Sequence, residues 1–299
     1  MSSFLTSRNV ADVLGGITNG VIYSLVALSL VLVWRSTRIL NFAQGAMAMI
    51  AAYIGFAVLA PSTNYWVSMA VAIIAGLALG GLTERVIVRG LYGKPEINPV
   101  VAMVGFLLVL ESVAAAIWST SSRGLPTPFS IVDWQINHKP VALSPFALYE
   151  IVTAVVVMTV IALLFQFTKL GLKLRASALA PEVSRLLGVR VGRMLTLGWM
   201  LSSAVGAVTA VLVASNYFTG LTPTTMDGVF AFGFIAEAIG GLNSPVGALV
   251  SVFSLGIILQ FVGDYLNSND IILVALGMLI VSLMVRPNGV FTRSAQRRV

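Results

Sequence analysis

Few side chains in this sequence could do chemistry, and the ones that stand out are carboxyl groups inside long apolar runs. Glu111 lies near the middle of the run 98–119, while Glu84 and Glu237 lie toward the ends of two other runs. An ionisable group at membrane depth is by default a candidate for function. Glu111 could serve as a proton relay or could be hydrogen-bonded inside a helix bundle. For Glu111 the second interpretation is favoured, because no His, Lys or Arg lies at matching depth as a partner. Glu237 is expected at the membrane interface.

Two amide side chains, Asn41 and Gln44, stand at the start of another apolar run. Amides in membrane helices can line a polar path or bridge neighbouring helices by hydrogen bonds. Both roles stay open for this pair, and helix bridging is the one we expect.

A short segment between two apolar runs, 240–248, carries the residues of a tight turn. Glycine permits positive φ and close approach of backbones, and proline stiffens a turn. We expect this segment to serve the architecture rather than to contact a substrate. Its turn residues are Gly240, Gly241, Pro245 and Gly247.

The motifs of enzymes and nucleotide-binding proteins are missing from the sequence. It has no Gly-rich phosphate-binding loop, no GxSxG, no HExxH and no cluster of Cys and His, and it contains no Cys at all. The lone His138 has no ligand partners nearby in sequence, so a metal site is not expected. We therefore predict a protein that is not an enzyme and that binds no cofactor itself.

The composition places the chain in a lipid bilayer. Hydrophobic residues make up 58% of the sequence and charged residues 10%, and the mean hydropathy is +0.96. A soluble domain carries far more charge, and a β-barrel would show short alternating segments instead of apolar runs of spanning length. The net charge of +7 comes from basic residues clustered between the runs. The positive-inside rule explains that pattern without nucleic acid.

The apolar runs predict an all-α, polytopic membrane protein of about eight or nine transmembrane helices. The seventh run is short and rich in Gly, so it could be a broken or partial span. The alternation of basic and basic-poor loops favours about nine crossings, with the N-terminus outside and the C-terminus in the cytoplasm. The predicted spans are 11–34, 39–60, 66–88, 98–119, 147–168, 194–214, 228–241, 246–264 and 270–285.

We expect one transmembrane domain over residues 1–299, with no room for a separate ATPase or receptor domain. Its longest outer loop is 120–146, which is either a docking surface for something outside the cell or a plain connector. Its main cytoplasmic loop is 169–193, which is rich in Lys and Arg.

Within this cytoplasmic loop, residues 181–188 predict one short helix. Pro181 suits the first helical position, where its missing N–H costs nothing. Glu182 meets the positive end of the helix dipole, and Gly188 is a natural C-terminal cap.

These motifs together resemble those of LivH-type permeases, the membrane subunits of branched-chain amino-acid importers of the ATP-binding-cassette (ABC) class. The run from Gly20 to Gly45, which ends in Asn-Phe-Ala-Gln-Gly, is similar to their opening segment. The stretch 175–193, followed by 201–207, is similar to their cytoplasmic coupling loop and the span after it. Residues 231–248 resemble their C-terminal motif, so the resemblance covers nearly the whole chain in the right order.

The resemblance implies a permease of the bacterial cytoplasmic (inner) membrane that moves branched-chain amino acids and works with several partners. These are a second, LivM-like permease or a second copy of this chain, two cytoplasmic ABC ATPases that use the ATP, and a periplasmic substrate-binding protein. The ATPases would dock on a coupling helix in each permease. In this chain the coupling-helix residues would be Pro181, Glu182, Arg185, Leu186, Leu187 and Gly188.

Two positions depart from the family pattern. Ala46 stands where a Glu usually follows the Asn-Phe-Ala-Gln-Gly run, and Ala180 stands where a polar N-cap usually precedes the Pro-Glu pair. An Ala N-cap typically costs about 1 kcal/mol of helix stability, so the coupling helix would be held more by its docking partner than by its own cap. Permeases of the same family for urea, short amides or other amino acids stay open as alternatives. An ion-coupled secondary carrier, suggested by Glu111, is a further one.

Overall fold

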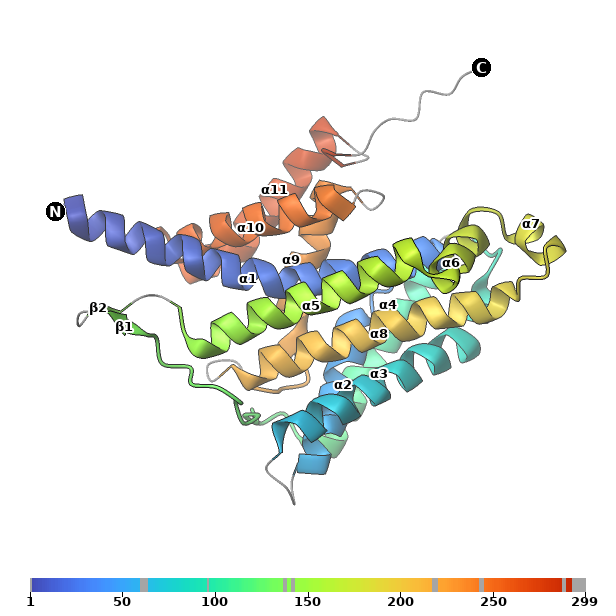
Figure 1. Cartoon of the computed structure of the whole chain (residues 1–299), viewed down its shortest axis with the longest axis horizontal. Helices are drawn as coiled ribbons and strands as arrows, with labels where there is room; N and C mark the ends of the chain where they lie inside the picture. The colour runs from blue at the N-terminus through green and yellow to red at the C-terminus, as the bar shows by residue number, and fades with distance from the viewer. Residues whose placement is uncertain are drawn as a thin grey trace. The chain divides into compact units, whose positions relative to one another are not determined.

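The structure, a computed structural model, is almost entirely helical (Figure 1). It describes residues 2–59, 64–95, 97–136, 139–140, 143–216, 220–241, 245–286 and 289–291. The helices are α1 (Ser2–Thr37), α2 (Gln44–Leu59), α3 (Tyr65–Val86), η1 (Val88–Leu91), α4 (Ile97–Trp118), α5 (Pro145–Phe167), α6 (Lys169–Leu179), α7 (Pro181–Leu186), α8 (Val191–Ser215), α9 (Thr225–Gly240), α10 (Pro245–Tyr265), η2 (Ser268–Asp270) and α11 (Ile271–Val285). Between α4 and α5, β1 (Gln135–Ile136) pairs antiparallel with β2 (Lys139–Pro140).

The prediction of an all-α, multi-span membrane protein is confirmed. Each predicted span coincides with a helix, because an apolar segment in lipid must satisfy its own backbone hydrogen bonds. Within the described residues, six helices are long and apolar enough to cross a membrane. They are 9–37, 65–91, 97–118, 145–167, 191–215 and 247–265. The apolar helices at 44–58 and 271–285 are shorter, so the number of crossings and the orientation stay predictions.

The chain divides into two compact units. Unit 1 comprises Met1–Ala27, Phe129–Ala154 and Ala231–Val299, and unit 2 comprises Leu28–Pro128 and Val155–Phe230. These two units do not test whether the whole chain forms a single transmembrane domain, so that expectation stays a prediction. His138 lies outside the described residues. So do residues 292–299, which include several of the basic residues used to orient the chain.

In unit 1, glycines bring α1 and α10 into backbone contact. A Cβ on Gly16 would lie 2.5 Å from the Cα of Ile257, and a Cβ on Gly256 would lie 2.5 Å from the carbonyl oxygen of Gly16. Small residues permit this approach in membranes, where helices associate by close packing rather than by a hydrophobic driving force. Beside this contact lies an apolar core that α9, α10 and α11 also line, with Ala236, Leu255 and Ala275 fully buried in it.

In unit 2, α3 and α8 touch in the same way along the length of both helices (Figure 1). A Cβ on Gly76 would lie 2.6 Å from the carbonyl oxygen of Ser203, and one on Gly80 would collide with the carbonyl oxygen of Trp199. The two glycines stand four residues apart, so they lie on one face of α3. Trp199 is fully buried, in a core that also contains Val33, Val88 and Met103.

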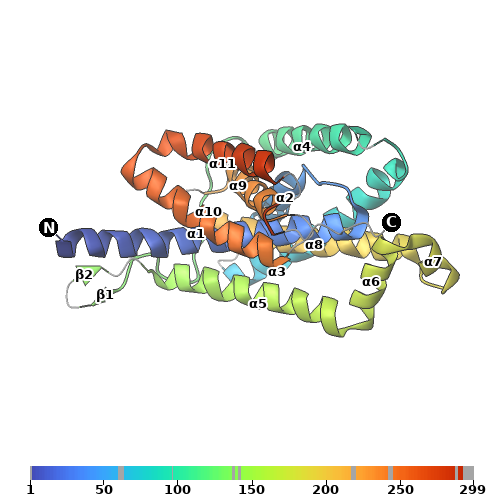
Figure 2. The ribbon, with the colours of Figure 1, turned by 90° about the horizontal axis from the view of Figure 1, so that it is seen from above.

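The segment 169–193, which is predicted to be cytoplasmic, contains a helix, α6, that the sequence analysis did not predict. The side chain of Thr168 accepts a hydrogen bond from the Gly171 amide at 3.0 Å and so caps α6. A side chain at Gly171 would collide with the backbone of Leu164 and Phe165 at the end of α5. The missing side chain therefore allows α6 to leave the end of α5 at a steep angle, which is visible from above (Figure 2).

The loop 120–146, which is predicted to lie outside, is hydrogen-bonded to its neighbours in unit 2 at its start. Arg123 and Leu221 exchange backbone hydrogen bonds of 3.1 and 2.7 Å. The Tyr53 hydroxyl donates to the Leu221 carbonyl at 3.4 Å, and its ring stacks on Trp118 with centroids 4.8 Å apart. The first residues of the loop are therefore part of the packed bundle.

The contact of α3 with α8 predicts the effect of adding one methyl group. We expect Gly80→Ala to lower the free energy of unfolding by about 2 kcal/mol, because the new Cβ forces the backbones apart. The matched control is Gly105→Ala in α4, where an added Cβ meets nothing within 4 Å; it should change stability by about 1 kcal/mol or less. SDS titration of both purified variants in mixed micelles measures the difference. Equal stability of the two variants would contradict the close packing.

Candidate functional site

The helix predicted in the cytoplasmic segment is present as α7, which has six residues. Pro181 occupies its first turn, and Glu182 supplies the only acidic group of that turn. Ala180 stands at the N-cap and makes no side-chain hydrogen bond to the helix, which is the uncapped start that the sequence indicates.

The C-terminal end of α7 is closed by a Schellman motif. Gly188 adopts a left-handed conformation, with φ of 77°. Its amide donates to the carbonyl of Arg185 at 3.0 Å, and the Val189 amide donates to the carbonyl of Ser184 at 2.9 Å. This pair of bonds defines the motif and favours glycine at the left-handed position. The cap predicted from Gly188 is therefore the one that ends the helix.

The surface of α7 is apolar where a water-facing helix would be polar. Leu186 is 87% exposed and Leu187 77%, and Val183 is more than half exposed. Only Ser184 is buried, facing the rest of the chain. Glu182 and Arg185, both exposed, place opposite charges beside the leucines. The two adjacent leucines therefore form an exposed apolar patch with opposite charges beside it.

The predicted amides, Asn41 and Gln44, form one buried hydrogen-bonded cluster in unit 2. The side-chain amide of Asn41 donates to the side-chain oxygen (Oε1) of Gln44 at 2.8 Å, and the Ser202 hydroxyl lies 3.2 Å from that same oxygen. The Gln44 amide donates to the backbone carbonyl of Ser202 at 3.2 Å. The Ser202 hydroxyl also lies 2.7 Å from the carbonyl of Ser29 in α1.

This amide cluster joins helices. Asn41, Gln44 and Ser202 are each 2% exposed or less, and their bonds connect the start of α2 to α8 and α1. Buried amides with satisfied partners hold neighbouring elements in register. The geometry therefore favours the helix-bridging role over a water-lined path, and Gly206 makes room for it, since a Cβ there would lie 2.7 Å from the Gln44 amide nitrogen.

The carboxyl groups of the spans have three different surroundings. Glu84 is fully buried and forms an ion pair with Arg89. Glu111 interacts with the side chain of Asp227, in the first turn of α9, so the structure supplies a neighbour that the sequence did not reveal. Glu237 is fully buried, and neither of its oxygens has a hydrogen-bond partner among the described residues.

The predicted turn residues come together in unit 1. Gly241 has φ of 96°, and a Cβ on Gly240 would lie 2.5 Å from the carbonyl carbon of Gly247. A Cβ on Gly289 would collide with Gly241, and α10 begins at Pro245. The segment therefore packs backbone against backbone, in line with an architectural role.

Metal-binding geometry is not found in the part of the chain that the structure describes. No three His, Cys, Asp or Glu side chains there lie close enough to hold an ion.

Comparison with known proteins identifies one family. Residues 13–284 match the family model described as branched-chain amino acid transport system / permease component. The chain is 27% identical to BraD of Pseudomonas aeruginosa, described as a high-affinity branched-chain amino acid transport system permease protein, across 96% of this chain and 97% of BraD. It is 26% identical to LivH of Escherichia coli K12, which has the same description, across 95% and 96%. It is 25% identical to a probable LivH of Methanocaldococcus jannaschii, across 90% of each.

The amide cluster predicts a loss of stability when its central member is removed. We expect Gln44→Met to lower the free energy of unfolding by about 2 kcal/mol, because the Asn41 amide and the Ser202 carbonyl lose their partner while remaining buried. The control is Gln260→Met, which removes one exposed bond to Asn19 and should have little effect. SDS titration measures both, and equal losses would argue against a bridging role.

Proposed function

The chain belongs to the family of permease components of branched-chain amino acid transport systems, and from this membership we propose that it is the membrane subunit of an ABC importer. It would carry leucine, isoleucine and valine, or close relatives of them, across the cytoplasmic (inner) membrane. The observation that carries the proposal is the match of residues 13–284 to the family, together with relatives aligned over nearly their whole length.

Energy for transport would come from separate subunits. The sequence has no nucleotide-binding loop, so ATP hydrolysis falls to two cytoplasmic ATPases. A second permease, LivM-like or a copy of this chain, would complete the path, and a substrate-binding protein would deliver the amino acid from outside. This chain therefore needs no enzymatic activity and no bound cofactor of its own.

Docking of an ATPase on α7 would explain the surface of that helix. Burying Leu186 and Leu187 in an apolar cleft would remove two exposed leucines from water, a gain of roughly 2 kcal/mol each. Glu182 and Arg185 would then pair with charges at the rim of the cleft. The partner would also order the N-terminal turn, where Ala180 offers no cap.

The substrate is set only in part by this chain. In importers of this kind, a binding protein that selects its ligand before delivery would determine which molecule is moved. Permeases of the same family for urea, short amides or other amino acids therefore remain the alternative. Ala46, which replaces the usual acidic residue, is buried in α2 beside the amide cluster, so it bears on the packing of α2 and does not identify a substrate.

A charge on the apolar face of α7 should separate docking from folding. We expect Leu186→Asp to reduce ATPase capture and substrate uptake at least about tenfold, because a buried unpaired carboxylate opposes docking. The measurement is affinity capture of the chain from gently solubilised membranes, with quantification of the ATPase by mass spectrometry, alongside uptake in cells.

The control places the same charge elsewhere. Val132 in the outer loop is 68% exposed, so Val132→Asp should leave ATPase capture unchanged. Normal capture and uptake in Leu186→Asp, with the wild-type chain capturing the ATPase, would rule out docking through this face.

The Glu111–Asp227 pair allows a test of the ion-coupled alternative. Glu111→Gln keeps a donor and an acceptor for Asp227 while removing one titratable group. In an ATP-driven importer we expect uptake within about twofold of wild type at every pH. A shifted pH dependence of uptake, in liposomes that contain no ATP, would favour a proton-coupled carrier instead.

A further inference from the structure

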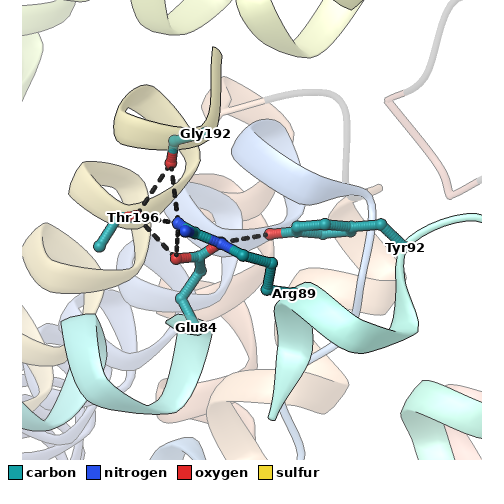
Figure 3. Close-up of polar contacts among 5 residues, drawn as sticks. All are labelled: Glu84, Arg89, Tyr92, Gly192 and Thr196. Atoms are coloured by element: carbon teal, nitrogen blue, oxygen red, sulfur yellow. Dashed lines mark hydrogen bonds and ion pairs between the residues drawn. The ribbon is translucent and has the colours of Figure 1, made fainter. Parts of the chain in front are cut away.

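The carboxylate of Glu84 is the centre of a polar cluster at the last turn of α3 (Figure 3). Arg89 donates to it twice, from Nε to Oε1 at 3.3 Å and from Nη2 to Oε2 at 2.9 Å. The Tyr92 hydroxyl donates to Oε1 at 3.3 Å, and the Thr196 hydroxyl donates to Oε2 at 2.6 Å. Each carboxylate oxygen thus accepts two bonds, which compensates the burial of the charge.

The cluster joins parts of unit 2 that are distant in sequence. Glu84 belongs to α3, Arg89 to η1, and Thr196 to the second turn of α8. Arg89 also donates to the Thr196 hydroxyl at 3.0 Å and lies 3.5 Å from the Gly192 carbonyl. One buried carboxylate and one guanidinium therefore hold the beginning of α8 to the end of α3.

The Tyr92 hydroxyl stays protonated across the physiological pH range. Burial raises the pKa of its hydroxyl, and the negative charge of Glu84 and the hydrogen bond to it raise the pKa further. The phenol consequently stays protonated and can donate its hydrogen bond to Glu84.

The helix that begins at this cluster follows α7 directly. The connection runs from Leu187 to Arg190 and is closed by the Schellman bonds to Ser184 and Arg185. Val191, the first residue of α8, is buried. Because this connection is short and hydrogen-bonded, a displacement of α7 would be passed on to the start of α8. Thr196 is the first side chain of α8 that bonds to a charged side chain of α3, the carboxylate of Glu84.

We propose that Glu84, Arg89 and Thr196 form a joint that passes the displacement of α7 to α3, so that α3 and α8 move as one body during transport. The proposal rests on the proposed docking of an ATPase to α7. The residues of the joint are positioning residues. The glycine contacts of α3 with α8 hold the helices laterally, and the charged bonds at their ends resist sliding of one helix along the other.

The test removes the bond between the helices and keeps the ion pair. Thr196→Val preserves the shape of the side chain and loses the hydroxyl. The complete importer, reconstituted in liposomes with its ATPases and binding protein, is assayed for substrate moved per ATP hydrolysed. We expect this ratio to fall about tenfold while binding of the ATPase and hydrolysis continue, since motion of α7 no longer reaches α3. Thr196→Ser, which keeps the hydroxyl, should restore the ratio.

The matched control is Thr209→Val on the same helix. Thr209 is fully buried, and its hydroxyl bonds only to the Val205 carbonyl one turn back, at 2.9 Å. The Thr196 oxygen also lies 2.9 Å from the Gly192 carbonyl one turn back, but its single proton is donated to Glu84. Both variants therefore remove a buried hydroxyl from α8, and Thr196→Val is the one that removes a bond to Glu84. The ratio should stay within about twofold of wild type in Thr209→Val.

Three results would overturn the joint. They are an unchanged ratio in Thr196→Val, an equal fall in Thr209→Val, and loss of ATPase binding in Thr196→Val alone, since a joint for motion is not needed for docking. Failure of the wild-type chain to bind any ATPase would instead remove the proposed function on which the joint rests.

Discussion

The direct contact of two helix backbones organises unit 2. At Gly76 and Gly80 the carbonyl oxygens of α8 occupy the space where side chains of α3 would otherwise stand. In a bilayer, apolar burial between helices gives little net driving force, so van der Waals contact and polar bonds at short range must supply it. Close approach of α3 and α8 also has a second effect. It buries side chains at the ends of the two helices. The Glu84 carboxylate is buried there and accepts four hydrogen bonds.

The position of each span follows from local composition, and the links between spans do not. Hydropathy places α4 within a residue of its observed ends, and Pro181 and Gly188 bracket α7 because proline and glycine act through their own backbone angles. The bond from Thr196 to Glu84 spans 112 residues, and the bond from Gln44 to Ser202 spans 158. Neither leaves a local signal, because each depends on how the helices pack. The sequence analysis missed α6 because this helix is not an apolar run. Its local signals were Thr168 and Gly171, a capping residue and a small residue at the required spacing.

The short helix α7 shows that not every element of a membrane protein must be stable in isolation. A helix of six residues is far below the length that is stable in isolation. The Schellman motif fixes the C-terminal end of α7 and carries the chain straight into α8, while the N-terminal end lacks a side-chain cap. Order is therefore strongest toward α8 and weakest at the end where a partner would bind. Such a gradient suits a docking element, because the partner completes the helix without having to build the connection to the bundle.

If separate ATPases drive this permease through α7, as proposed, its carboxyl groups differ in what they could contribute to the coupling. Glu111 and Asp227 interact with each other, and Glu237 is buried without a hydrogen-bond partner among the described residues. Glu84 differs because its bonds cross from α3 to η1 and to α8. The Arg89 side chain is 46% exposed, and an ion pair with one solvent-exposed partner contributes little net stability. The value of the pair to the fold therefore lies in fixing one relative position of the helices. Under the proposed docking, a force applied at α7 would move α3 only if that position is kept, and the charge-assisted bonds near the start of α8 would keep it.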